Sequence, residues 1–348
     1  MNIYVYDETL QLKGVLDAIK SVIWHEKYCG TGDFDLQLPV EVVDKNILHE
    51  DTFLARPDSK TVMVVERIEL KTDEENGDTW VITGRSAEAL LDRRVVWDQM
   101  NLNGNVIREA VRIVKENIVA PAQLSRAMPL LQIGEQAEFS ETITKQLMGE
   151  VVLDALTEIL QTYGLGFSLK LDNAKGIFLF CIQKGTNRSR DNPENVPVVF
   201  SENMDNLLQS DYVEDYTTYK NVCLVGGESE GTARRFSEIG TASGMQRREM
   251  FYDGSSISSN EGEVSESDYK QMLVEAGKEQ IEQVPVLKTF TGEIDNAGTY
   301  IYDRDYFLGD VVTLENAYGI SANVRITDVT KNSDDTGETI VLSYESIE

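Results

Sequence analysis

One order of segments occurs near both ends of this 348-residue chain, and it constrains the fold more than any single motif. Each copy has an aspartate, an aromatic-Leu pair, an Arg-Ile pair, an acidic turn and a return strand. The first copy comprises Asp51, Phe53-Leu54, Arg67-Ile68 and Gly77 to Ile82, and the second comprises Asp305, Phe307-Leu308, Arg325-Ile326, Asn332 to Thr336 and Gly337 to Leu342. Two interpretations stay open: a duplicated β building block, or two unrelated hairpins that share alternation and an acidic turn.

Short apolar alternations between turn residues predict strands throughout the first third of the chain. An opening hairpin is expected over 3–16, and strands over 21–24 and 34–38 flank a turn at 30–33. The clearest hairpin runs from Val62 to Leu70, turns through Asp73 to Gly77, and returns from Thr79 to Ile82. Its turn ends in Asn-Gly, which supplies positive φ angles. A barrel or a sandwich is the expected outcome.

Helical spacing of apolar residues predicts one short helix and three longer ones. Ser86 is expected to cap a short helix over 87–94, and amphipathic helices are expected over 105–118 and 148–163. Strands follow over 166–171 and 177–182, then a polar loop over 184–195, strands over 211–219 and 221–226, and an acidic loop over 253–263. The last helix begins at Ser265 and shares one face among Tyr269, Met272, Leu273 and Ala276, and strands return over 285–348.

These segments predict a mainly β chain with α+β insertions, in which two related β-barrel domains are combined with mixed α/β domains. The length is sufficient for several hydrophobic cores. We expect an N-terminal β-barrel domain at 1–98, a mixed α+β domain at 99–200, a β-rich and helical connecting domain at 201–284, and a C-terminal β-barrel domain at 285–348.

The charge balance argues against nucleic-acid recognition. The chain has 32 basic and 60 acidic residues, a net charge of −28, so it repels phosphate backbones. The same acidity also suits solubility alone. No segment is apolar enough for a membrane span, and the N-terminus lacks the pattern of a signal peptide. Three scattered cysteines (Cys29, Cys181 and Cys223) predict buried free thiols and a reducing compartment.

The residues that carry most enzyme chemistry are scarce. Only His25 and His49 are present, and no histidine follows Cys181 or Cys223 in the chain, which excludes zinc motifs and a Cys-His nucleophile of the usual order. In an extended segment His25 and Cys29 lie about 13 Å apart, too far to form a dyad. Carboxylate pairs are too numerous to indicate a glycosidase. We expect no catalytic, cofactor or metal site.

Three arginine pairs stand out in this acidic chain: Arg93-Arg94, Arg234-Arg235 and Arg247-Arg248. Arginine binds carboxylates in a two-pronged geometry, so these residues are candidates for a subunit interface, with solvated surface as the alternative. Gly226, Gly227 and Gly231 lack the Lys-Ser or Lys-Thr of a phosphate loop and predict a surface turn. Five aromatic residues are expected in the core: Trp24, Tyr28, Phe34, Trp80 and Trp97.

Several of these segments also occur together, in the same order, in a known family. They are Ser21 to Trp24 with Tyr28, Gly32 to Phe34 and Leu36 to Pro39; Glu66 to Glu69 with Thr83 to Arg94; Tyr219 to Val222 with Val225 to Gly227; Arg247 to Glu249; and Leu308 to Val312. Together they resemble the tail-associated (Tal-like) baseplate hub proteins of siphophages, a family similar to the baseplate hubs of contractile-tailed phages. The resemblance spans nearly the whole chain and is weakest over 100–200.

The resemblance implies a homotrimeric structural hub ring at the distal end of the tail tube, through which DNA is ejected. Two similar barrels per chain would give a trimer six similar edges to set against a sixfold tube. The implied partners are the distal tail protein and other tail-tip proteins, with the tape-measure protein as a further candidate. The implied place is the virion tail tip, after assembly in the cytoplasm of the bacterial host, and the family brings no catalytic residues.

Two alternative functions stay open beside the structural hub. One is a receptor-binding tail protein that recognises cell-wall saccharide, and the other is a tail-associated peptidoglycan hydrolase. A prophage remnant or a tail-like bacteriocin would use the same hub, so the sequence does not separate these from an infectious phage.

Overall fold

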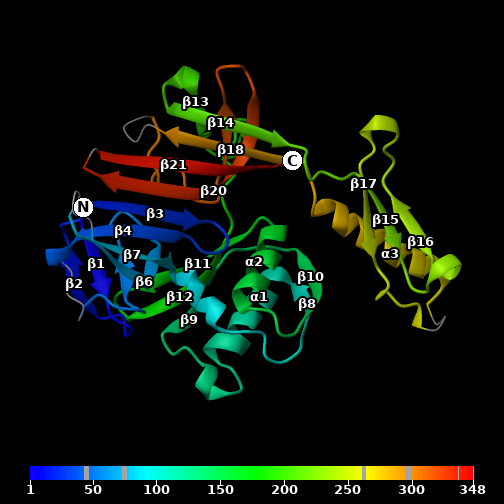
Figure 1. The fold of residues 1–348 in the computed structure, drawn as a ribbon, viewed down its shortest axis with the longest axis horizontal. Helices are drawn as coiled ribbons and strands as arrows, with labels where there is room; N and C mark the ends of the chain where they lie inside the picture. Colours follow the sequence, from blue (N-terminus) through cyan, green and yellow to red (C-terminus); the bar gives the residue numbers. More distant parts are fainter. Residues whose placement is uncertain (43–46, 73–76, 261–263, 295–298, 336, 348) are drawn as a thin grey trace. The chain divides into compact units, whose positions relative to one another are not determined.

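The computed structural model describes residues 1–42, 47–72, 77–260, 264–294, 299–335 and 337–347. The chain divides into two compact units (Figure 1). The larger unit comprises Met1–Asp211 and Phe290–Glu348, and the smaller unit comprises Tyr212–Thr289. The division into four domains that the sequence predicts stays a prediction.

The larger unit is organised around a sheet of thirteen strands, so the expected mainly β fold is confirmed. Its main path runs β14-β18-β21-β20-β3-β4-β7-β6-β5-β1-β2, and β19, which pairs with β13, adjoins β20 beside this path. The path is open at both ends among the described residues, so two closed barrels stay a prediction. The strands are β1 (Ile3–Tyr6), β2 (Leu12–Leu16), β3 (Ser21–Lys27), β4 (Asp33–Pro39), β5 (Phe53–Ala55), β6 (Val62–Lys71), β7 (Thr79–Ser86), β13 (Val199–Ser201), β14 (Leu207–Asp215), β18 (Leu287–Ile294), β19 (Val311–Glu315), β20 (Ser321–Asp334) and β21 (Gly337–Ser346).

Two sets of five strands within this sheet have the same spatial order. In the first set β3, β4, β7, β6 and β5 are neighbours in that order, and in the second set β14, β18, β21, β20 and β19 are neighbours in that order. When the five strands of each set are numbered in chain order, their spatial order in both sets is first, second, fifth, fourth and third. This agreement favours a duplicated building block over two unrelated hairpins.

The central hairpins of the two sets also share their register. In β6 and β7, Lys71 pairs with Thr79, and five pairs later Glu66 is left as an extra residue. In β20 and β21, Asn332 pairs with Thr339, and five pairs later Thr327 is the extra residue. A β-bulge at one position in both hairpins is a specific feature, because a bulge bends its strand and re-aims the side chains beyond it.

The chain also enters the third strand of each set in the same way. The residue two positions before the strand has positive φ: Asp51 at 64° and Gly309 at 92°. In both sets, the N–H of this positive-φ residue donates to the carbonyl of the residue just before the bulge. The carbonyl of the residue that follows it accepts the N–H of that same pre-bulge residue. The bonds are Asp51 N to Val65 O (3.1 Å) and Val65 N to Thr52 O (2.9 Å), then Gly309 N to Ile326 O (2.9 Å) and Ile326 N to Asp310 O (2.9 Å).

The residue equivalences that the sequence suggests are wrong on the outgoing strands. Register places Arg67 opposite Thr83 and Asp328 opposite Ser343, so Arg67 corresponds to Asp328 and not to Arg325. Likewise Phe53 corresponds to Val311. Phe53 pairs with Val64 and Val311 pairs with Arg325, and these two partners each lie two residues before the bulge residue. The return strands correspond as the sequence predicts, with Thr79 equivalent to Thr339. The two Arg-Ile pairs look alike in the sequence but lie on opposite sides of the bulge, since Arg67 follows Glu66 and Arg325 precedes Thr327. Residues 73–76 and 336 of the two turns lie outside the described residues.

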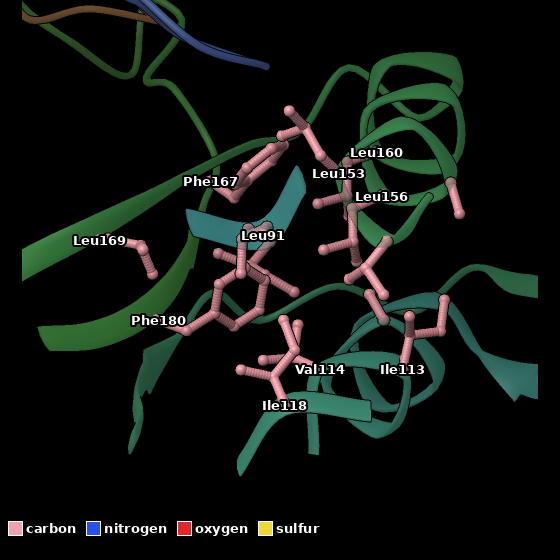
Figure 2. Packing of buried hydrophobic residues seen from close by; sticks show 14 of the residues in the cluster. Leu91, Ile113, Val114, Ile118, Leu153, Leu156, Leu160, Phe167, Leu169 and Phe180 are labelled. Carbon is pink, nitrogen blue, oxygen red and sulfur yellow. The ribbon is translucent and has the colours of Figure 1, made fainter. Parts of the chain in front are cut away.

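A helical module over residues 87–183 separates the two strand sets along the sequence. Its elements are the 3-10 helix η2 (Ala87–Arg93), β8 (Met100–Asn105), α1 (Val106–Val114), the π-helix η3 (Lys115–Val119), the 3-10 helix η4 (Leu124–Arg126), β9 (Leu131–Gln136), β10 (Thr142–Leu147), α2 (Val152–Thr162), β11 (Gly166–Asp172) and β12 (Ile177–Gln183). The predicted helices over 105–118 and 148–163 are confirmed. Figure 2 shows Ile113, Leu156 and Phe180 from α1, α2 and β12 converging on one core.

In its described residues, the smaller unit is a three-stranded sheet with one α-helix. Its strands are β15 (Val222–Gly226), β16 (Phe236–Ile239) and β17 (Glu249–Asp253), in the order β16-β15-β17. The helix α3 (Glu266–Glu282) packs Tyr269 and Leu273 against Cys223. The predicted start is confirmed, because Ser265 Oγ accepts the Asp268 N–H at 3.2 Å. Further 3-10 turns in the chain are η1 (Val40–Val42), η5 (Glu202–Met204), η6 (Gly231–Ala233) and η7 (Gly244–Gln246).

Three side chains differ from what the sequence predicts. Ser86 makes no cap bond to the short helix, because its Oγ accepts the Gly32 N–H at 3.0 Å instead. Met272 is exposed, since the buried stripe of α3 follows the four-residue spacing of Tyr269 and Leu273. Trp97 is exposed and stacks under the Arg126 guanidinium, 4.8 Å from the ring centroid. The other four aromatic residues assigned to the core are buried.

Candidate assembly surfaces

The two strand sets are joined inside the chain by one edge-to-edge pairing, here called the seam. Beyond its bulge at Thr327, β20 leaves β19 and pairs antiparallel with β3. The pairing runs from Asp328 opposite Lys27 to Ser333 opposite Val22. Figure 1 shows β3 and β20 side by side at this seam. The first strand of one set thus pairs with the fourth strand of the other.

A buried ion pair lies across the seam. Lys331 Nζ is 3.1 Å from Glu26 Oε1, and both side chains are buried. Ser59 Oγ donates to the same carboxylate oxygen at 2.8 Å, and Lys331 also donates to the Asp58 carbonyl at 2.5 Å. A buried charge needs such partners, because desolvation otherwise costs several kcal/mol. The pair therefore fixes how the two sets meet.

His25 provides a second polar link across the seam. Its Nε2 is 2.9 Å from Asp328 Oδ1 on β20, and its Nδ1 is 3.0 Å from Asp33 Oδ2 on β4. The hydrogen bond with Asp328, followed by that with Asp33, raises the pKa of His25 above its ordinary value despite partial burial. Burial raises the pKa of Asp328, but hydrogen bonds from His25 and Thr327 outweigh it, so that pKa is lowered. The structural role expected of His25 agrees with this geometry.

Tyr28 ties the helical module to the second strand set. Its hydroxyl donates to the Gln183 carbonyl at 3.0 Å and accepts the Gly185 N–H at 3.0 Å. A Cβ atom on Gly309 would lie 2.1 Å from the Tyr28 ring, so only glycine allows this approach. The Arg325 guanidinium lies over the ring, 5.6 Å from its centroid.

The polar segment predicted as a boundary loop is bound to β19. Asp310 is buried and accepts the Thr186 N–H at 2.7 Å, and its other carboxylate oxygen lies 2.7 Å from Arg188 Nε. Val311 exchanges backbone hydrogen bonds with the same segment, through Thr186 O at 2.9 Å and Arg188 N at 2.7 Å. This buried carboxylate thus anchors the return of the chain from the helical module.

The six arginines predicted at an interface all have partners within the chain. Arg93 pairs with Asp51 at 2.5 Å, and Arg94 donates to the Arg126 carbonyl at 2.7 Å. The other four lie in the smaller unit: Arg234 pairs with Asp253, Arg235 with Glu228 and Glu266, Arg247 with Glu238 and Glu249, and Arg248 donates to the Tyr216 carbonyl. Their role in binding a neighbouring subunit stays a prediction.

A cavity of about 280 Å³ opens beside the seam in the larger unit. Its wall mixes acids and bases, among them Glu26, Lys60, Lys170 and Asp310, and therefore favours no single ligand charge. Within the described part of the chain, no group of three or more His, Cys, Asp or Glu side chains is placed to hold a metal ion. The described helices include none long and apolar enough to cross a membrane.

Sequence reasoning missed the ion pair at the seam. One signal was present: Val22, Trp24 and Glu26 alternate along one strand, so Glu26 points to the same buried side as the two apolar residues. An acid at a buried position implies a cationic partner. Nothing in the sequence identifies Lys331 as that partner.

Comparison with known proteins gives this fold a context. No curated protein matches the sequence. The prophage MuSo2 43 kDa tail protein from Shewanella oneidensis has a similar structure, with a TM-score of 0.61 and 11% identity over 99% of this chain and 98% of that one. A tail protein from Neisseria meningitidis has a TM-score of 0.60 and 12% identity, over 99% and 96% of the two chains.

A third similar structure is also a prophage tail protein. Prophage tail protein gp18 from Listeria monocytogenes has a TM-score of 0.53 and 12% identity, over 100% of this chain and 96% of that one. At such low identity these likenesses establish the fold, which is that of phage tail proteins. The family model of siphovirus ReqiPepy6 Gp37-like proteins matches residues 2–343. The chain therefore belongs to the siphovirus ReqiPepy6 Gp37-like family.

Proposed function

We propose that this chain is a non-enzymatic structural protein of the tail tip, and that three copies form a hub ring at the distal end of the tail tube. The observation that carries the proposal is the duplicated five-strand set, joined edge to edge at the seam. A chain with two related sets matches threefold and sixfold neighbours at once, because three copies present six similar edges. The family and the shared fold support a role in the tail.

In the proposed ring each set contributes to a β-barrel, and DNA leaves the tail through the centre. The net charge of −28 supports a channel that does not retain DNA, since an acidic wall releases no counterions from phosphates. The proposed partners are the distal tail protein, other tail-tip proteins and the tape-measure protein. A saccharide-binding or peptidoglycan-degrading role has no specific observation in its favour.

Two measurements test this function. Sedimentation equilibrium of the purified chain at high concentration should give three times the 39.1 kDa of one chain. Electron microscopy of tails that carry an epitope-tagged chain should place gold-labelled antibody at the distal end. A chain that stays monomeric at high concentration, or label along the tube or at the head end, would contradict the proposal.

A further inference from the structure

Because the two strand sets are equivalent, two pairings between a fourth strand and a first strand are possible. One of them forms inside the chain, and the other does not form within the described residues. At the seam, the fourth strand of the second set, β20, pairs with the first strand of the first set, β3. The second possible pairing would join the fourth strand of the first set, β6, to the first strand of the second set, β14. Within the described residues, the sheet order places no strand against the outer edge of β6 beyond Glu66, and β14 ends the sheet.

The side chains of β6 become exposed at the point where its outer edge has no partner strand. Four apolar residues of β6 before the bulge are buried, and the residues from Glu66 to Lys71 are all at least partly exposed. The contrast with the second set is direct: Leu70 is 44% exposed, whereas the equivalent Lys331 on β20 is 5% exposed beneath the seam. A leucine is therefore more exposed than the lysine at the equivalent position.

The outer edge of β14 has the same character. Leu208 is 61% exposed, although Leu207 beside it is buried. An open strand edge with an exposed leucine is a template for another strand. The segment of β14 within the larger unit, Leu207–Asp211, is long enough to pair with the five residues of β6 that follow the bulge.

We propose that Arg67–Lys71 of one copy pairs antiparallel with the Leu207–Asp211 segment of a second copy, repeating the seam between chains. The occupant is a second copy because the seam itself shows how a first strand of one set pairs with a fourth strand of the other. Each copy offers one free β6 edge and one free β14 edge, so the contact between copies is heterologous. A set of such contacts leaves no edge unpaired only when the copies form a ring. This inference rests on the proposed trimer and specifies its interface.

Charge and apolar substitutions test the pairing in the full-length chain. Leu70→Glu and Leu208→Glu each place an unpaired charge in the proposed interface, so each should weaken trimer formation at least about a hundredfold. Leu12→Glu is the matched control, because Leu12 is 55% exposed on β2 at the other end of the sheet. This control should stay trimeric, and urea unfolding should confirm that all three variants fold.

Cross-linking gives an independent result. Leu70→Cys combined with Leu208→Cys or with Ser210→Cys should form disulfides between chains under mild oxidation, whereas Leu12→Cys with Leu208→Cys should not. The native Cys181 and Cys223 are buried and should not interfere, whereas Cys29 is only partly buried and is replaced by serine in every cross-linking variant. A wild-type trimer that tolerates both glutamates and forms no Leu70-dependent cross-link overturns the edge pairing and leaves the proposed function intact. A wild-type chain that never trimerises overturns both.

Discussion

Glu26 Oε1 and Lys331 Nζ lie 3.1 Å apart at the seam, and both side chains are almost wholly buried. The two residues are far apart in the chain, so their contact fixes the position of the second strand set against the first. Ser59, Asp58 and Tyr302 complete the polar surroundings of the pair, Tyr302 with a hydroxyl 3.4 Å from Glu26 Oε2. The pair works as a specific link, because each charge depends on the other for its solvation.

Removing one member of this pair should cost more stability than removing an exposed cation. Lys331→Ala leaves the Glu26 carboxylate buried without its cation, so we expect the free energy of unfolding of the larger unit to fall by about 3 kcal/mol or more. Urea denaturation followed by circular dichroism measures this change. Lys27→Ala is the control, because Lys27 is exposed and lies 3.9 Å from Asp328, and it should cost less than about 1 kcal/mol.

The double variant Glu26→Gln with Lys331→Met distinguishes charge from packing. Two neutral side chains of similar size remove the uncompensated charge, so the double variant should recover much of the stability lost in Lys331→Ala. If the double variant is as unstable as Lys331→Ala, the loss comes from packing, and the account of the buried charge is wrong.

His25 should make stability depend on pH near neutrality. Its pKa is raised in the folded chain, chiefly by Asp328, so protonation favours folding. The contribution is complete below the unfolded pKa of 6.5 and disappears as the pH rises through the folded pKa. We therefore expect wild type to exceed His25→Gln in unfolding free energy by about 1 kcal/mol near pH 6, with the difference shrinking at alkaline pH.

Chemical denaturation at several pH values above 5.5 provides the measurement, because the lowered pKa of Asp328 keeps that carboxylate ionised in this range. A difference between wild type and His25→Gln that grows as the pH rises would show that His25 is neutral in the folded chain. His49→Gln is the control, since His49 lies in a loop and, in the described contacts, its imidazole bonds only to the adjacent Glu50 carbonyl at 2.8 Å. Its effect should not vary in the same way.

Gly309 should tolerate substitution far less than another glycine with positive φ. Alanine at Gly309 (φ +92°) places Cβ 2.1 Å from the Tyr28 ring, whereas alanine at Gly319 (φ +79°) meets open space. We expect Gly319→Ala to cost about 1 to 2 kcal/mol from backbone strain alone, and Gly309→Ala to cost about 1 to 3 kcal/mol more. Thermal unfolding compares the two variants, and equal losses would exclude the proposed clash.

The sequence predicted local structure well because local structure depends on neighbouring residues. The apolar run that opens Val62 to Lys71, the glycine at Gly77 and the cap at Ser265 were sufficient to place a hairpin and a helix. The paired strands β8 and β10 were missed because polar residues dominate both, and only their inward residues, such as Leu102, are apolar and buried. Local pattern is a weak guide to such short strands.

The assembly surfaces were harder to predict because they depend on residues distant in the chain. Alternation placed Glu26 on a buried face, but its partner lies on a strand near the other end of the chain. The sequence indicates the repeat but not its register, because the similar Arg-Ile pairs at Arg67 and Arg325 lie at different positions relative to the two bulges. A bulge leaves no reliable mark in the sequence, so only the pairing of strands reveals it.

Arg235 provides the last test, because it separates folding of the smaller unit from assembly. Its guanidinium lies 4.0 Å above the centroid of the Tyr269 ring and pairs with Glu228 and Glu266. Arg235→Ala should therefore destabilise the smaller unit by about 1 to 2 kcal/mol, seen as faster hydrogen exchange in α3. Arg247→Ala should cost less stability than Arg235→Ala, since both carboxylate partners of Arg247 are exposed to solvent. If instead both variants leave hydrogen exchange unchanged and lower the mass of the trimer equally, these arginines bind a neighbouring subunit rather than their own unit.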